Sequence, residues 1–332
     1  MGLREIGSGR GLRHFGAMMA TAAAMVSLPL DSASATENGR NPFPLGLNGS
    51  QAGNLPPKGV YLVNEMAYIT ADTFNDENGD ELFPDTELTI LAYAPRLLWN
   101  SGVKLVGAEL AIQAIQPIVH IEFNNDAPRF PFGPVPPPGF PVNGVGPFGH
   151  DEQFGLADFI ITPIMAWHSG EMHWAVGVDV NFPTGKFDKD ELVNLGLGYW
   201  AISPAVAVTW LSEMGPEISA KATLDYNFEN PETNYDSGEA VFIEPVVAYH
   251  IQTPIGKIIP GIGGFYYQQI TDDEGSVPAA LGDFRGRAVG VGPVIVYQHP
   301  IGAMVEFKFQ KEYYVEARPQ GERAFARAFI RF

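Results

Sequence analysis

The sequence contains no cysteine. This excludes disulfides, thiolate metal centres and cysteine nucleophiles. Charge is also scarce, since charged residues make up 17% of the 332 residues and hydrophobic residues 45%. Such a chain is too apolar to remain disordered. Basic residues are the smaller share of the charge, 20 against 38 acidic residues, and the net charge is −18. We therefore expect no nucleic-acid partner, because that affinity depends on cations that neutralise phosphates.

Long apolar runs are absent after residue 35. A membrane-spanning helix needs about 20 such residues, so none is expected there. Glycine and proline are abundant instead, at 37 and 28 residues, which favours many turns over long helices. The length allows one large β domain or two smaller ones.

The first 35 residues have the features of an export signal. Arg4, Arg10 and Arg13 form a basic start, an apolar stretch covers residues 15–30, and residues 33–35 read Ala-Ser-Ala. We expect residues 1–35 to be a cleaved signal peptide. A membrane anchor is the alternative, but the apolar stretch is short for one. Residues 36–59 are rich in Gly, Pro and Asn without periodicity. They are expected to form an irregular periplasmic lead-in or a partial plug, or else a flexible leader.

Residues 217–228 alternate polar and apolar side chains without a fault, from Glu217 to Phe228. A period of two is a strand period. Twelve residues exceed the usual strand of about five or six, but they suit a tilted strand that crosses a bilayer, which needs about 9 to 11. A long strand in a soluble sandwich is the alternative for this stretch alone.

Twelve strand-like runs follow one another from residue 60 onward, and short turns alternate with long connections between them. The predicted runs are 60–70, 86–99, 103–123, 156–168, 171–183, 198–211, 217–228, 239–252, 257–270, 286–298, 302–314 and 323–332. This segregation of loops is typical of transmembrane barrels. The predicted fold is an all-β, antiparallel up-and-down barrel of about 12 strands over residues 60–332, with short periplasmic turns and long extracellular loops. The longest of these loops, 124–155, is proline-rich and expected to be exposed.

Inward-facing positions follow from the alternation. The charged candidates for the barrel lumen are Asp179, Lys221, Asp225, Glu244, His250, Glu306, Lys308, Arg323, Arg327 and Arg331. Opposite charges on neighbouring strands could equally serve only to neutralise one another. Two stretches break the pattern. The phase changes near residues 107–109, which we interpret as a bulge, and Lys311 falls on the outer face, which we interpret as snorkelling at a strand end.

Tryptophans mark the predicted membrane interfaces. Trp99, Trp167, Trp174 and Trp210 fall beside predicted short turns, and Trp200 falls beside a long loop. We expect these five residues to form an aromatic girdle.

The last ten residues alternate again and end on Phe332. This ending resembles the closing strand of bacterial outer-membrane barrels, and the resemblance implies that Phe332 is an assembly signal read by the outer-membrane assembly machinery. Arginine on a lipid-facing position near the midplane costs roughly 2 to 4 kcal/mol. The face with Arg323, Arg327 and Arg331 is therefore predicted to point inward.

Chemical motifs are weak throughout. His168, Glu171 and His173 could suggest a metal site, but their spacing is not that of a helical zinc site, and the stretch is predicted to be a tight turn. Ser169 beside His168 could suggest a lipid-degrading enzyme, but adjacent residues rarely point at one another. We expect no metal, no cofactor and no enzymatic activity.

Several motifs resemble one family of outer-membrane proteins. They read LPPKGVY at 55–61, WHSG at 167–170, NFPTGKFD at 181–188, NLG at 194–196, YW at 199–200, YNFEN at 226–230 and YDSG at 235–238. They are similar to the family named for the meta-cleavage pathway of phenol degradation. The resemblance implies a transmembrane barrel that is often called a transporter and is associated with the catabolism of aromatic compounds.

Two functions of different classes remain open at this point. The first is an outer-membrane channel for small hydrophobic or aromatic molecules, whose partners are membrane lipid, the assembly machinery and the solute. The second is a non-transporting structural or surface-binding barrel. Both place the protein in the bacterial outer membrane. A twelve-stranded barrel is wider than the eight-stranded kind that side chains fill and narrower than open porins.

Overall fold

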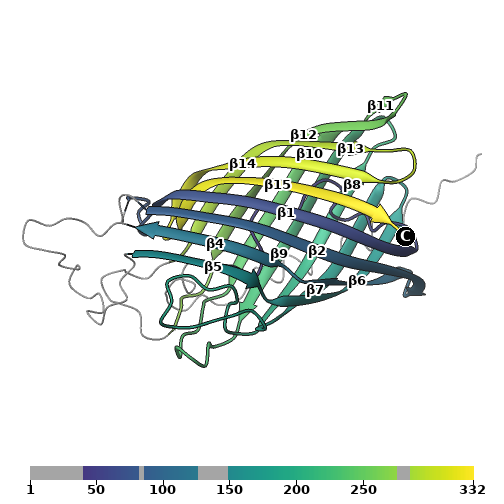
Figure 1. Cartoon of the computed structure of the whole chain (residues 1–332). Helices are drawn as coiled ribbons and strands as arrows, with labels where there is room; N and C mark the ends of the chain where they lie inside the picture. The colour runs from purple at the N-terminus through teal and green to yellow at the C-terminus, as the bar shows by residue number, and fades with distance from the viewer. Residues whose placement is uncertain (1–39, 82–85, 126–148, 275–284) are drawn as a thin grey trace, which may run out of the picture. The chain divides into compact units, whose positions relative to one another are not determined.

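The structure is a computed structural model that describes residues 40–81, 86–125, 149–274 and 285–332. Every regular element among these residues is a β-strand (Figure 1). No helix in these ranges is long and apolar enough to cross a membrane. The strands are β1 (Gly59–Phe74), β2 (Thr86–Leu105), β3 (Ala108–Ile115), β4 (Ile118–Asn125), β5 (Gly149–Leu156), β6 (Phe159–Ser169), β7 (Met172–Phe182), β8 (Ala201–Leu211), β9 (Pro216–Asn227), β10 (Ala240–Tyr249), β11 (Ile251–Thr253), β12 (Gly256–Gln269), β13 (Arg287–Gln298), β14 (Met304–Glu316) and β15 (Pro319–Arg331).

The sheet closes on itself through β1. This strand pairs antiparallel with β15 on one side and with β2 on the other. From β1 the ring runs through β15, β14, β13, β12, β10, β9, β8, β7, β6, β3 and β2. Twelve strands therefore form a closed antiparallel barrel, with β4, β5 and β11 as additions. The predicted fold class is confirmed.

The barrel is polar inside and apolar outside. Along β9, Glu217, Ser219 and Asp225 are fully buried, whereas Ile218 and Tyr226 are 51% and 46% exposed. A soluble sandwich would show the opposite distribution, because water would have to solvate the apolar face. Alternating strands with an apolar outer face and a polar lumen are the pattern of a transmembrane barrel.

The first short turn lies elsewhere than predicted. Strand β2 continues through residues 100–102, where the ladder with β3 shifts register between Asn100 and Lys104. The chain reverses at Val106 and Gly107, whose φ angles are +49° and +79°. The bulge and the turn are thus exchanged relative to the prediction. Asn-Ser-Gly has turn chemistry, but here the Asn100 side chain accepts a hydrogen bond from the Gly102 amide at 2.9 Å inside the ladder.

The predicted loop 124–155 was too long, because its last residues form β5. Residues 126–148, with their prolines, lie outside the described residues. Strand β5 pairs with β4, and β4 pairs with the N-terminal half of β2, residues 86–93. The predicted run 103–123 is divided at residues 116–117 into β3 and β4, and the predicted run 156–168 begins at Phe159 as β6. On the short-turn side of these breaks, β3 and β6 pair with each other and continue the barrel wall.

Other boundaries differ in smaller ways. The predicted strand 239–252 divides into β10 and β11, and the last strand begins at Pro319. Lys311 lies on the outer face as predicted, within β14 rather than at its end. Its ammonium group is 3.1 Å from the carboxylate of Glu322, which explains how an outward lysine is accommodated.

The connections at the long-loop end are held partly by one buried carboxylate. Asp273 accepts hydrogen bonds from the Gly238 amide and the Gln269 side chain, each at 2.7 Å, and contacts the Tyr235 hydroxyl. Burial raises the pKa of Asp273 from 3.8 to about 8, although its hydrogen bonds oppose the shift.

This raised pKa predicts that the loops around Asp273 loosen as the pH rises. The folded state holds the proton more tightly than the unfolded state, so stability falls between about pH 4 and pH 8. Protease nicking of residues 229–238, normalised to cleavage of an unfolded peptide, should be faster well above the folded-state pKa than well below it. Asp273→Asn keeps an acceptor oxygen and should reduce the difference. An equal pH dependence in both proteins would contradict the assignment.

Candidate functional site

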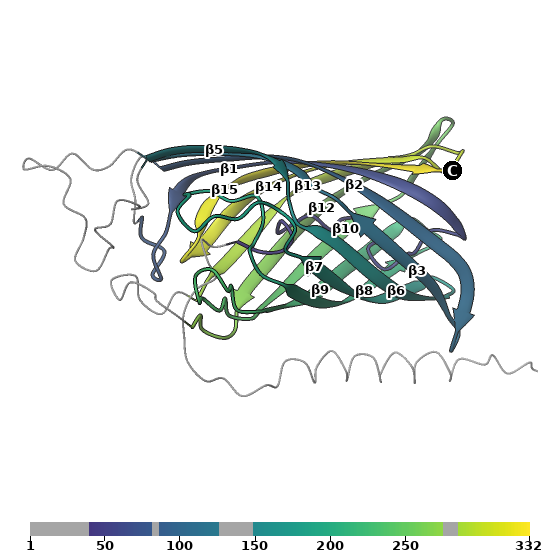
Figure 2. The same cartoon turned by 60° about the horizontal axis from the view of Figure 1, so that its bottom comes forward.

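Residues 40–57, which we call the lead-in segment, run inside the barrel without regular structure (Figure 2). Inward side chains of the wall bind its backbone. Lys308 donates hydrogen bonds to the carbonyls of Leu47 and Asn48 at 3.1 and 2.6 Å. Glu244 accepts a hydrogen bond from the Asn48 amide at 3.0 Å. These bonds satisfy backbone groups that have no ladder partner.

A second anchor lies nearer the short-turn end. Glu217 accepts hydrogen bonds from the Ser50 hydroxyl at 2.8 and 2.9 Å and from the Gln51 amide at 2.6 Å. His250 Nε2 lies 2.6 Å from the same carboxylate. Glu306 accepts a hydrogen bond from the Ser50 amide at 3.2 Å. Ser50, Gln51 and His250 therefore converge on the Glu217 carboxylate.

The approach of the lead-in segment to the wall requires glycine at two positions. Gly46 has a φ of +79°, and an added Cβ would lie 1.9 Å from the Gln310 side chain. A Cβ on Gly49 would lie 2.2 Å from the Glu306 carboxylate. A larger residue at either position would have to displace the facing wall side chain or the segment itself.

An ionic belt runs over the neighbouring strands β14, β15, β1 and β2 on the inner wall, at the level of Leu47. Glu65 on β1 pairs with Arg96 on β2 and with Arg327 on β15, the latter at 2.6 Å. Arg327 also lies 3.7 Å from Glu306 and donates to the Leu47 carbonyl at 2.8 Å. Each buried charge has an opposite partner, which offsets much of its desolvation cost. The belt and the lead-in segment together separate two cavities.

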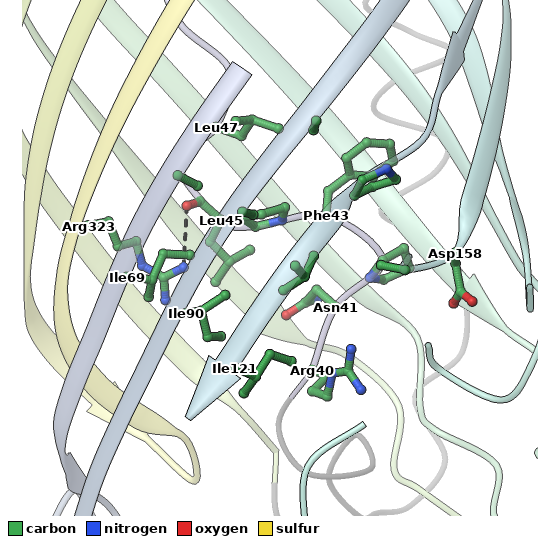
Figure 3. Close-up of a pocket in the computed structure, with 18 of the residues that line it drawn as sticks. Arg40, Asn41, Phe43, Leu45, Leu47, Ile69, Ile90, Ile121, Asp158 and Arg323 are labelled. Atoms are coloured by element: carbon green, nitrogen blue, oxygen red, sulfur yellow. Dashed lines mark hydrogen bonds between the residues drawn. The ribbon is translucent and has the colours of Figure 1, made fainter. Parts of the chain in front are cut away.

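The cavity on the long-loop side is mostly apolar (Figure 3). Its volume is about 230 Å³. Leu45 and Leu47 of the lead-in segment face Ile69, Ile90 and Ile121 of the wall across it. Arg40, Asp158 and Arg323 stand at its edges. A space of this size and lining suits a small apolar molecule with few polar groups.

The wall beside this cavity lacks a continuous strand ladder. Among the described residues, β5 pairs only with β4 and has no strand on its other edge. The connection 183–200 covers that edge. Asp158 holds the connection by accepting hydrogen bonds from the amides of Gly185 and Leu197, both at 2.8 Å. Leu195 from this connection lines the cavity.

The cavity on the short-turn side is larger and more polar, with a volume of about 720 Å³. Residues 48–57 of the lead-in segment border it together with small wall residues such as Gly177, Ala205 and Ala207. His168, His173 and Glu109 also line it. Among the described residues, no group of three or more His, Asp or Glu side chains is arranged to hold a metal ion.

Most of the ten predicted lumen residues lie inside the barrel. Asp225 accepts hydrogen bonds from Ser203 and Asn41, and the carboxylate of Asp179 is 3.4 Å from Lys221. Arg323 pairs with Glu312 at 2.6 Å. Arg331 is the exception, because it is exposed at the short-turn mouth, where it donates to the Lys58 carbonyl. Buried residues among the ten are Asp179, Asp225, Glu244, His250, Glu306, Lys308 and Arg323.

Other interior residues were not predicted. Glu65 and Arg96 lie on β1 and β2, where the alternation also carries a signal for the inner face. The alternation predicts Glu217 on the polar face of its strand but gives it no role. Asp158 and the apolar residues of the 183–200 connection could not be found from periodicity, because they lie where the strand pattern ends.

The tryptophans of the predicted girdle lie on the outer face of the barrel. Trp167 and Trp174 stack with centroids 6.4 Å apart, and Trp99 and Trp200 are 52% and 47% exposed. Trp99 does not adjoin a short turn, since the turn has moved to residues 106–107. Phe332 is exposed, and its amide donates to the Val60 carbonyl at 3.0 Å. Its role as an assembly signal stays a prediction.

Residues 71–328 match the model of the family described as "Putative MetA-pathway of phenol degradation". The chain belongs to this family. No curated protein matches the chain. The fold is similar to the crystal structure of an outer membrane channel from Pseudomonas putida F1, with a TM-score of 0.69 and 15% identity over 86% of this chain and 99% of that one. The β domain of a Bordetella autotransporter gives 0.46 with 8% identity over 83% and 100%. A FadL homologue from Pseudomonas aeruginosa gives 0.40 with 9% identity over 90% and 98%.

The close approach at Gly49 predicts how the lead-in segment can be released. Gly49→Val should displace the segment from Glu306, because the new side chain overlaps that carboxylate. Protease added to purified protein in detergent should then cut within residues 40–57 faster than in the wild type. Ala220→Val is a suitable control, since Ala220 lies on the outer face of β9, away from the lead-in segment. Equal protection in both variants would show that the contact at Gly49 does not hold the segment.

Proposed function

We propose that this protein is an outer-membrane channel for small apolar molecules, aromatic ones in particular, and that the lead-in segment is its partial plug. The observation that carries the proposal is the mostly apolar cavity inside a lumen that also holds a belt of buried charges. A purely structural barrel needs its charges paired, but it gains nothing from leaving an apolar space unfilled, since voids cost stability.

The route through the barrel is narrow in this proposal. The lead-in segment and the belt of Glu65, Arg96 and Arg327 separate the two cavities. An apolar molecule gains nothing from crossing such a belt, because it would displace charged pairs without replacing their interactions. The interrupted wall beside β5 offers it a way between the apolar cavity and the membrane. Ions and polar solutes would instead need the lead-in segment to move.

Family membership supports the solute class. The family description names phenol degradation, and a pathway of that kind requires aromatic molecules to pass an outer membrane whose polar surface hinders apolar compounds. The competing function is a structural or surface-binding barrel, which would leave permeability unchanged.

Deleting residues 41–57 should raise the single-channel conductance of purified protein in planar bilayers. The deletion removes the segment that separates the cavities, and the inward charges Lys308, Glu244 and Glu217 then face open water. Heat-modifiable migration on gels should confirm that the barrel still folds. Unchanged conductance of a folded deletion variant would contradict the plug. If neither protein conducts ions and neither changes solute uptake by cells, the structural barrel is the better interpretation.

Fastening the 183–200 connection to β5 should reduce uptake of apolar solutes. A Cβ on Gly155 would lie 2.9 Å from Leu195 Cδ1, so side chains at these two positions touch, and loss of free thiol on oxidation checks that a cysteine pair there has closed. The wild type has no cysteine, so oxidation acts on this pair alone. Intact cells with the oxidised Gly155→Cys/Leu195→Cys protein should accumulate the fluorescent aromatic amine N-phenyl-1-naphthylamine more slowly than the same cells after reduction. Each single variant is the control. Equal uptake in both redox states would exclude passage beside β5.

A further inference from the structure

The β6–β7 hairpin brings two histidines together at the short-turn end. His168 and His173 are directly paired in the ladder, so their side chains leave the same face of the sheet. Their Nδ1 atoms are 2.8 Å apart, and the ring centroids are 5.0 Å apart with the planes at 61°. The Nδ1 atoms of the two rings therefore face each other.

This geometry is close to that of two ligands on one metal ion. In the absence of a metal, one imidazole must donate an N–H to the lone pair of the other. A metal ion would replace that proton and accept both lone pairs. With metal–nitrogen distances of about 2.0 to 2.1 Å and a tetrahedral angle, the two nitrogens would lie about 3.3 Å apart. The rings therefore need to separate by only a fraction of an ångström.

The hairpin holds the two rings in place before any ion binds. On the opposite face, Trp167 and Trp174 are paired in the ladder and stacked with an interplanar angle of 12°. The strands are joined by a short turn, with Ser169 paired to Met172. Little conformational entropy would be lost on binding, because the ligand positions already exist.

The surroundings of the pair suit a cation and remain open to solvent. His168, His173 and Glu109 line the same polar cavity at the short-turn mouth. Glu109 is held by Asn100 at 2.9 Å, with Lys104 at 3.5 Å from its carboxylate. Because no third protein ligand is arranged around the histidines among the described residues, water would complete the coordination.

We infer that His168 and His173 form a binding site for a divalent first-row transition metal at the short-turn mouth of the barrel. Imidazole nitrogens suit copper, nickel and zinc, with copper bound most tightly. Sequence spacing argued against a helical zinc site, but it did not address a pair formed across two strands. The site is independent of the apolar cavity and of solute passage.

Calorimetric titration of the untagged full-length protein in detergent with zinc and nickel chloride tests the site. We expect one ion per chain. His168→Ala and His173→Gln should each weaken binding by about tenfold or more, since losing even an outer-shell partner costs a metal site 10- to 100-fold. With copper, the electron paramagnetic resonance spectrum of the wild type should show coupling to two nitrogens, and that of each variant to one.

His120→Ala and His299→Ala are the matched controls, since both residues are histidines of the same barrel outside the pair. They should leave the affinity unchanged, and heat-modifiable migration checks the fold of every variant. Absence of saturable binding by the wild type at submillimolar metal would overturn the inference. Stoichiometric binding that survives loss of both His168 and His173, or that is lost in the controls, would overturn it equally.

Discussion

The structure depends on satisfying the backbone of an irregular segment inside a closed barrel. Residues 40–57 make no ladder, yet their amides and carbonyls lie where water is limited, and an unpaired buried group there is costly. The wall supplies the partners through long charged side chains such as Lys308, Arg327 and Glu217. The same residues neutralise one another across strands. Interior charge, which is expensive to bury, is thereby used for both purposes.

This arrangement divides the lumen by polarity. Charged residues gather where they can reach both the lead-in backbone and an opposite charge, and Glu65 with Arg96 and Arg327 completes that group. Above it the lead-in segment turns apolar side chains, Phe43, Leu45 and Leu47, toward the wall. The wall that faces them is mostly isoleucine and alanine. The apolar cavity therefore arises because one part of the lead-in segment packs toward apolar wall residues, whereas the other part binds charged ones.

Local pattern in the sequence was enough to predict most of the barrel. The alternation in β9 and the order of long and short connections depend only on neighbouring residues, and they led to twelve strands and to the inward face. The prediction failed where two local signals competed. Asn100-Ser101-Gly102 has the chemistry of a turn, but tertiary pairing makes it a bulge, and Val106-Gly107 turns instead.

The site was harder to predict because its contacts join distant parts of the chain. Lys308 and Asn48 are 260 positions apart, and no periodicity relates them. The inward placement of Lys308 followed from alternation, but its partner in the lead-in segment did not. His168 and His173 illustrate the opposite case, since they are only 5 positions apart. Their approach depends on ladder register, which a tight turn fixes once its position is known.

The part of the wall beside β5 is also explained by how its backbone groups are hydrogen-bonded. Among the described residues, the free edge of β5 has no ladder with a neighbouring strand. A ladder there could open only if many hydrogen bonds broke together. Side chains replace that ladder. Asp158 binds the amides of Gly185 and Leu197 and the side chain of Asn181 at 3.0 Å, and Asp151 of β5 accepts a hydrogen bond from the Val193 amide at 3.0 Å. Such bonds can be lost by the movement of a few side chains, without unpairing the strands on either side. Around the ionic belt, twelve strands thus close the barrel through continuous ladders. Beside the apolar cavity, side-chain contacts hold the wall instead. Local opening is least costly there, because few backbone bonds must break.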